Sequence, residues 1–155
     1  MSALRQRRGV RKGEQGNVKK AKLIHEACEI GDVDELTHLA RTRGGLLNDG
    51  LRRKAWPILL HCVRVPRSQV ATATENQLDE SQVHMDVIRS LGHLPEDFRA
   101  QKQQELKEVV LEVLRRHPQL HYFQGFHDVC AVFLKVLGRR RGVTALEHVA
   151  LFFLR

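Results

Sequence analysis

Residues 96–117 read EDFRAQKQQELKEVVLEVLRRH, and this stretch indicates the fold class of the chain. Its apolar side chains return every three or four residues, which is the spacing of one face of an α-helix. The positions that form this stripe are Leu106, Val110, Val113 and Leu114. Pro118 comes directly after the stretch, and proline cannot continue a helix because it has no N–H to donate. We therefore predict a long amphipathic helix from about Glu96 to His117.

The same helical spacing recurs over most of the remaining chain. It predicts helices over about 18–31, 32–44, 48–62, 79–90 and 126–137, and a final one from 144. Two of these helices open with Asp or Thr followed three residues later by glutamate, which is the pattern of a capping box. The pairs are Asp32 with Glu35 and Thr144 with Glu147. No stretch alternates polar and apolar residues as a strand does, so the predicted fold class is all-α.

Two segments between the predicted helices lack this spacing. Residues 63–77 are rich in Pro, Ser, Thr and Ala, and we predict a mobile loop there. Residues 119–125 form a polar connection that carries an aromatic pair. Pro57 falls inside the helix predicted over 48–62, where it should kink or interrupt the helix.

The positive charge of the chain is concentrated at its N-terminus. The 155 residues carry 26 basic and 18 acidic side chains, for a formal net charge of +8. Residues 1–22 hold eight of the bases and one acid, Glu14, so this segment carries +7 and the rest of the chain +1. Such a block is typical of a solvated, disordered tail, which we predict ahead of a helical domain over 23–155. Contact with anionic lipid head groups is an alternative for this tail. Nucleic acid is not an expected partner, because no aromatic residues alternate with the bases.

Composition and hydropathy indicate a folded cytoplasmic protein. Apolar residues make up 42% of the chain, enough for a core, which argues against wholesale disorder. The three cysteines, Cys28, Cys62 and Cys130, are odd in number and scattered, as in a protein with reduced thiols. No charged-then-apolar leader opens the chain, and its longest apolar runs, 129–134 and 149–154, are too short to span a bilayer.

The sequence predicts neither a metal site nor a nucleotide site in this chain. The Gly-rich phosphate loop that ends in Gly-Lys-Ser/Thr is absent. His25 and Glu26 begin like a zinc-protease helix, but Glu29 stands where a second histidine ligand would be. Four further potential ligands lie near one another in sequence without a Cys-x-x-Cys anchor, and we expect the histidines to be surface or supporting groups. They are His117, His121, His127 and Cys130.

Three short motifs could carry chemistry. The first is Arg52-x-x-x-Trp56, the second is Val83-x-x-Asp86-x-x-Arg89, and the third is Tyr122-Phe123-Gln124-Gly125. Taken singly, each has an ordinary structural explanation: the tryptophan as a core anchor, the Asp–Arg pair as a surface ion pair, and the last motif as a turn.

Taken in order, the three motifs resemble the signatures of the TBC-domain Rab GTPase-activating proteins, over roughly residues 29–155. Val83 stands where the family pattern usually has isoleucine. The resemblance implies an all-helical domain in which Arg89 is an arginine finger and Gln124 a glutamine finger for GTP hydrolysis on the Rab. Supporting roles are implied for five other residues. These are Asp86 and Tyr122, which would orient the fingers, Gly125, which permits close backbone approach, and Arg52 and Trp56 as scaffolding.

The resemblance also implies a partner and a cellular setting. The partner would be a Rab in its GTP-bound state, which brings the GTP and Mg²⁺, so that the chain needs no cofactor of its own. The role would be regulation of vesicle traffic between the endoplasmic reticulum and the Golgi. Relatives of this type sit on the cytosolic face of the endoplasmic reticulum through a C-terminal anchor that is absent here. The family's domain continues beyond residue 155, so we expect a C-terminally truncated domain, with a non-catalytic Rab-binding or inert fragment as the alternative function.

Overall fold

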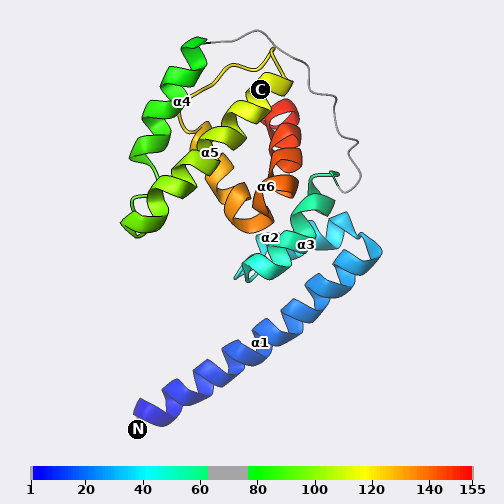
Figure 1. The fold of residues 1–155 in the computed structure, drawn as a ribbon. Helices are drawn as coiled ribbons and strands as arrows, with labels where there is room; N and C mark the ends of the chain where they lie inside the picture. The colour runs from blue at the N-terminus through cyan, green and yellow to red at the C-terminus, as the bar shows by residue number, and fades with distance from the viewer. Residues whose placement is uncertain (1, 63–76, 155) are drawn as a thin grey trace. The chain divides into compact units, whose positions relative to one another are not determined.

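The computed structural model describes residues 2–62 and 77–154, with side chains described for 15–62 and 80–154. Every regular element in these ranges is a helix, which confirms the all-α prediction. The helices are α1 (Ser2–Ile30), α2 (Val33–Arg41), α3 (Asp49–Leu59), α4 (Gln77–Arg89), α5 (Glu96–Arg116) and α6 (Phe126–Phe152) (Figure 1). The chain divides into two compact units, Met1–Val63 and Arg64–Arg155, where the sequence predicts one helical domain over 23–155.

In the first unit α1, α2 and α3 pack against one another around a small apolar core. Its buried members are Ile24, Ala27, Leu36, Leu39, Leu46 and Ala55. Trp56, which the sequence suggests as a core anchor, is partly buried and packs against the edge of this cluster. The apolar spacing of all three helices therefore serves one shared interior.

The junction between α1 and α2 follows the sequence prediction in most respects. Gly31 has φ +74°, a left-handed conformation that glycine adopts without steric cost, and α1 stops there. The Asp32 side chain accepts the backbone N–H of Glu35 at 2.9 Å, as a helix N-cap does. The backbone N–H of Asp32, however, donates to the Ala27 carbonyl at 2.9 Å. The Asp32 N–H is therefore already bonded at the end of α1. It is not available to the Glu35 side chain, as a full capping box would require.

The N-terminal segment differs from its prediction. The sequence predicts a disordered tail over 1–22, whereas α1 continues back to Ser2 as a helix. Arg, Lys, Gln and Ala, which are good helix formers, make up much of this segment, and glycine is the main exception. Local propensity therefore accounts for the helix where net charge alone predicts disorder.

The helix that carries Pro57 ends soon after it. Pro57 lies within α3, which stops at Leu59, so the predicted helix over 48–62 is shorter at its C-terminal end. The closing turn is held by the N–H of Leu60 on the Trp56 carbonyl, 2.9 Å, and by the N–H of Cys62 on the Pro57 carbonyl, 2.9 Å. The mobile loop predicted over 63–77 falls on residues 63–76, which lie outside the described ranges, and on Gln77, which begins α4.

The second unit is built on α5, which packs against both α4 and α6 (Figure 1). All four residues of the stripe quoted above are buried, which confirms the long amphipathic helix. The rest of this core comes from α4, α5 and α6. It includes Val83, Val87, Val109, Phe126, Cys130, Val143 and Leu146.

The last helix departs from prediction at its middle. The sequence predicts one helix over 126–137 and another from 144, with Thr144 and Glu147 as a capping box. In the structure α6 is kinked at Gly138 (φ +72°, ψ +171°), and helix resumes before Thr144. The predicted capping box is therefore wrong, because Thr144 is already inside a helix. Glu147 instead accepts a hydrogen bond from Arg116 of α5 at 3.1 Å.

The C-terminal turn of α6 is apolar and only partly covered. Val149 and Ala150 are buried, whereas Phe152 and Phe153 are 67% and 62% exposed. Three arginines, residues 139–141, interrupt the apolar character of α6 just after its kink. In the described part of the chain, no helix combines the length and the apolar character that crossing a membrane requires.

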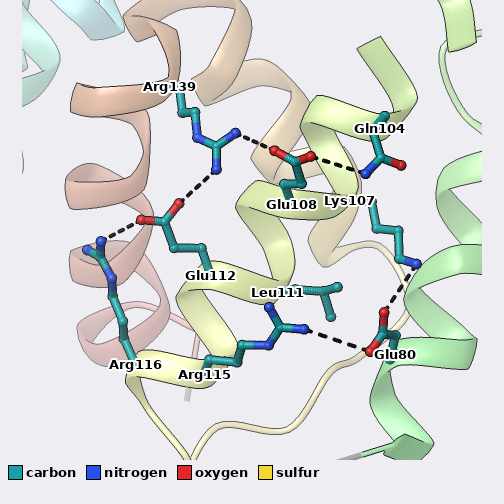
Figure 2. A pocket seen from close by; sticks show the side chains of 9 residues that line it. All are labelled: Glu80, Gln104, Lys107, Glu108, Leu111, Glu112, Arg115, Arg116 and Arg139. Carbon is teal, nitrogen blue, oxygen red and sulfur yellow. Dashed lines mark hydrogen bonds and ion pairs between the residues drawn. The ribbon is translucent and has the colours of Figure 1, made fainter. Parts of the chain in front are cut away.

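Ion pairs connect the three helices of the second unit around a pocket of about 590 Å³ whose lining residues are mostly charged (Figure 2). Glu80 of α4 lies 3.2 Å from Lys107 and 3.8 Å from Arg115, both on α5. Arg139 of α6 lies between Glu108 and Glu112 of α5, 3.3 Å from the latter. These ion pairs join α4 and α6 to α5. Their side chains are partly exposed, so the pairs lie between the core and the solvent.

Candidate functional site

The second and third motifs meet at Asp86. This residue lies on α4 and is only 6% exposed. Its Oδ2 accepts a hydrogen bond from the Tyr122 hydroxyl at 2.9 Å, and its Oδ1 accepts one from the Gln82 amide at 3.2 Å. Tyr122 belongs to the connection between α5 and α6, so one side-chain contact joins that connection to α4.

The chemistry of this contact fixes the protonation of both groups at neutral pH. The hydrogen bond from Tyr122 is the largest cause that holds the pKa of Asp86 below its usual value, and burial opposes it without cancelling it. The Gln82 amide and the nearby Arg89 cation act in the same direction as Tyr122. Burial, and then the hydrogen bond to Asp86, raise the pKa of the Tyr122 phenol. Asp86 is therefore an ionised acceptor and Tyr122 a neutral donor.

Arg89 is the last residue of α4 and is exposed. Among the described residues its guanidinium makes no hydrogen bond or ion pair, and its attraction to Asp86 is electrostatic only. The sequence predicts that Asp86 orients Arg89, but in the structure both Asp86 oxygens are hydrogen-bonded to Tyr122 and Gln82. The Arg89 side chain is thus left available to a partner.

The helix end that presents Arg89 is held by a residue that the sequence did not single out. The Gln103 side chain, from α5, donates to the Ile88 carbonyl at 2.8 Å and to the Ser90 carbonyl at 3.0 Å. These two carbonyls flank Arg89 in the chain, so Gln103 fixes the backbone on both sides of it. A glutamine within an amphipathic helix gives no sequence signal for this role, which depends on the packing of α5 against α4.

Gln124 lies in the turn that precedes α6 and is exposed. Gly125 follows with φ +99° as the N-cap of α6, a conformation in which a side chain would be strained. Phe123 and Phe126 lie on either side of this pair in sequence, and their rings are in contact, with centroids 5.5 Å apart and planes tilted by 42°. The turn therefore directs Gln124 outward while its flanking aromatic residues pack together.

His127 closes this turn. The sequence suggests a surface or supporting histidine, but the residue is only 8% exposed, and its Nδ1 lies 2.8 Å from the Tyr122 hydroxyl. The hydrogen-bonded chain therefore runs from Asp86 through Tyr122 to His127. Of the other potential ligands, His117 lies 3.4 Å from Glu147 and Cys130 is buried in the core. In the described part of the chain, no three His, Cys, Asp or Glu side chains gather as metal ligands would.

The five candidate residues of the second unit are Asp86, Arg89, Tyr122, Gln124 and Gly125. In a helix, residues three apart have Cβ atoms about 5–6 Å apart, which applies to Asp86 and Arg89. Gln124 can lie at most about 7 Å along the chain from Tyr122. The contact between Asp86 and Tyr122 therefore keeps the exposed side chains of Arg89 and Gln124 in one region of the second unit. Two candidates, Arg52 and Trp56, belong to the first unit, where Arg52 pairs with Asp49 at 2.6 Å in the first turn of α3.

An all-α fold with these three motifs in order defines the class as the TBC-domain proteins. The family model described as the Rab-GTPase-TBC domain matches residues 49–152, and the chain belongs to this family. The match begins at the first residue of α3 and extends to the last residue of α6.

Individual relatives share the sequence over most of this chain. TBC1 domain family member 20 of Bos taurus is 38% identical over 157 residues, which cover 95% of this chain and 39% of the bovine protein. The human protein of the same name is 39% identical over 145 residues, covering 88% of this chain and 36% of the human protein. GTPase-activating protein GYP8 of Saccharomyces cerevisiae is 33% identical over 118 residues, 74% of this chain and 24% of its own length. The chain thus spans less than half the length of these relatives.

Proposed function

We propose that the chain acts as a GTPase-activating protein for a Rab family small GTPase. Support comes from membership of the Rab-GTPase-TBC domain family and from relatives that are themselves named GTPase-activating proteins. The observation that carries the proposal is the 2.9 Å hydrogen bond between Asp86 and Tyr122, because it holds the segments of Arg89 and Gln124 together. Arg89 and Gln124 are the finger residues of this proposal.

Arg89 would stabilise the charge that develops on the phosphoryl oxygens during hydrolysis. An exposed guanidinium without a competing partner among the described residues can approach the γ-phosphate of a bound nucleotide. It carries a permanent charge and a planar fork of donors, which the point charge of a lysine does not reproduce. In GTPases, an arginine supplied by an activating protein contributes about 10³–10⁵ in rate.

Gln124 would position the attacking water. A carboxamide can accept a hydrogen from water through its oxygen and donate to a phosphate oxygen through its nitrogen. Its place in a turn braced on both sides favours a fixed presentation, which is what positioning requires. GTP and Mg²⁺ would arrive with the Rab in its GTP-bound state, and the chain itself would hold no cofactor.

The cellular setting follows as part of the same proposal. The chain would act in the cytoplasm, on Rab proteins of vesicle traffic between the endoplasmic reticulum and the Golgi. The bases of residues 1–22 would add contact with anionic membranes, because such a segment gains about 1 kcal/mol per base near an anionic surface.

Single-turnover GTP hydrolysis on a panel of Rab proteins tests the proposal. We expect the chain to accelerate hydrolysis on at least one Rab, and expect Arg89→Lys and Gln124→Ala each to remove most of that acceleration. Matched controls are Arg141→Lys and Gln101→Ala, which change exposed residues of α6 and α5 for which no hydrogen bond or ion pair is seen in the described part of the chain. Both controls should keep the activity of the unchanged protein.

Two outcomes would contradict the proposal. Full activity of Arg89→Lys would mean that a simple positive charge suffices and that Arg89 is no finger. Binding of a GTP-loaded Rab without acceleration on any member of the panel would identify a binding module in place of an activator.

A further inference from the structure

The turn that presents Gln124 is closed by a hydrogen bond between side chains at its two ends. Tyr122 lies two residues before Gln124 and His127 three residues after it, and the Tyr122 hydroxyl lies 2.8 Å from His127 Nδ1. Phe123 and Phe126 form a second, apolar contact across the same turn. The residue between these contacts, Gln124, is exposed, whereas His127 is almost fully buried.

The direction of each hydrogen bond follows from counting hydrogens. Asp86 is ionised and can only accept, so the one hydrogen of the Tyr122 hydroxyl is donated to Asp86 Oδ2. The Tyr122 oxygen is then left with acceptor capacity only, and His127 must donate to it through an N–H at Nδ1. The arrangement assigns a hydrogen to Nδ1 of His127, while the other ring nitrogen, Nε2, lies 3.4 Å from the exposed carboxylate of Asp128. A side chain without a donor at that point would leave Tyr122 tied to α4 alone.

We propose that His127 is a positioning residue for Gln124: its Nδ1–H holds the Tyr122 oxygen, closes the turn over residues 122–127 and fixes the direction of Gln124. This inference rests on the proposed function for its consequence in catalysis, but the closure of the turn stands on its own geometry. His127 contacts neither nucleotide nor Rab in this scheme. It acts through Tyr122 on the presentation of Gln124.

Substitutions at position 127 distinguish the effect of the N–H donor on the turn from the effect of side-chain packing. His127→Asn keeps an N–H close to the place of Nδ1, whereas His127→Leu fills the site without a donor. His84→Leu is the matched control, because His84 is an exposed residue of α4 for which no side-chain hydrogen bond or ion pair is seen in the described part of the chain. All variants are made in the full 155-residue chain.

Amide hydrogen exchange provides a readout that needs no Rab. In His127→Leu we expect the amides of Phe126, Asp128 and Val129, which donate to the carbonyls of Phe123 and Gly125 in this turn, to exchange at least ~10-fold faster than in the unchanged protein, since the turn opens more often. His127→Asn should restore most of the protection, and His84→Leu should leave it unchanged. Unchanged protection in His127→Leu would overturn the inference, and so would equal loss of protection in the Asn and Leu variants, which would assign the effect to packing.

Single-turnover hydrolysis then tests the link to Gln124. We expect His127→Leu to lower the maximal rate by about 10²-fold, the order expected for a small misplacement of a reacting group, with the half-saturating Rab concentration little changed. In a Gln124→Ala background the same substitution should lower the rate no further, because both act through one group. An equal loss in both backgrounds would overturn the inference. Failure of the unchanged chain to stimulate any Rab would instead count against the proposed function, and hydrogen exchange would still decide the role of His127.

Discussion

The hydroxyl of Tyr122 donates to the carboxylate of Asp86 at 2.9 Å, across 36 residues of sequence. One end of this bond lies on α4, one turn before Arg89, and the other lies in the turn that presents Gln124. Because Asp86 is almost fully buried, the bond is shielded from competing water. This buried contact therefore helps to fix the relative position of the two proposed fingers, together with the apolar core that α4 and α6 share.

Tyr122→Phe should uncouple the two finger segments and make the stability of the chain less dependent on pH. The pKa of Asp86 is lower in the folded chain than the usual value of about 3.9, so its ionisation stabilises the fold above that pH, and the gain is lost as the pH falls through the folded-state pKa. Tyr122→Phe removes the largest cause of the lowered pKa. The loss of unfolding free energy caused by the substitution should therefore be full at pH 7 and shrink below about pH 4.

Urea unfolding at pH 7, 5, 4 and 3 measures this difference. The control is Tyr122→Phe in an Asp86→Asn background, in which the pH dependence from this site should vanish. A stability difference between the unchanged protein and Tyr122→Phe that stays constant from pH 7 to pH 3 would contradict the expected coupling.

Gln103→Leu should loosen the end of α4. The side-chain amide of Gln103 bonds the carbonyls on both sides of Arg89, and leucine can make neither bond. We expect the amides of Arg89 and Ser90 to exchange faster, and the rate of Rab-stimulated hydrolysis to fall by about 10–100-fold through misplacement of Arg89. Gln101→Leu, on an exposed position of the same helix, is the control and should change neither quantity. Equal behaviour of the two variants would exclude a positioning role for Gln103.

The helices were predictable because their signals are local. The stripe at Leu106, Val110 and Val113, the stop at Gly31 and the cap at Asp32 each depend on residues within one or two turns. The capping box predicted at Thr144 failed for a different reason. Thr144 and Glu147 carry the local pattern of a capping box, but Glu147 accepts a hydrogen bond from Arg116, 31 residues away, and the helix begins earlier.

The residues of the candidate site also differ in whether the sequence alone could identify them. Arg89, Gln124 and Asp86 stand out in the sequence because their motifs resemble a family pattern. Gln103 does not stand out, and His127 stands out only as a potential metal ligand, because their partners are a pair of carbonyls near the end of another helix and a hydroxyl across a turn. Contacts of this kind depend on how α4, α5 and the turn before α6 pack, and no spacing rule within one helix encodes that packing.

Gly125→Ala should destabilise the second unit through the backbone alone. No atom lies within 4 Å of the place that a Cβ would occupy, so the substitution causes no clash with neighbouring groups. The φ of +99° is nevertheless unfavourable for alanine, with an expected loss of about 1–2 kcal/mol in unfolding free energy.

Gly142→Ala is the control for Gly125→Ala. Gly142 is helical, and its added Cβ would meet the Phe133 carbonyl at an ordinary 3.5 Å, so we expect a gain of up to about 1 kcal/mol. Equal effects of the two substitutions in thermal unfolding would show that the turn tolerates a side chain by changing its backbone.

Two adjacent arginines at the end of α5 should differ sharply in their contribution to stability (Figure 2). The Arg116 side chain is 19% exposed and reaches both Glu112 and Glu147, the latter at 3.1 Å with its side chain 11% exposed. The Arg115 side chain is 62% exposed and lies 3.8 Å from Glu80. Removing one partner of a buried ion pair leaves the other charge without compensation and typically costs 3–5 kcal/mol, and we expect Arg116→Leu to lose about 3 kcal/mol. Arg115→Leu should lose less than about 1 kcal/mol, as exposed pairs do. Denaturant unfolding of both variants gives the comparison, and losses of similar size would mean that water reaches the Arg116 pair as freely as it reaches the Arg115 pair.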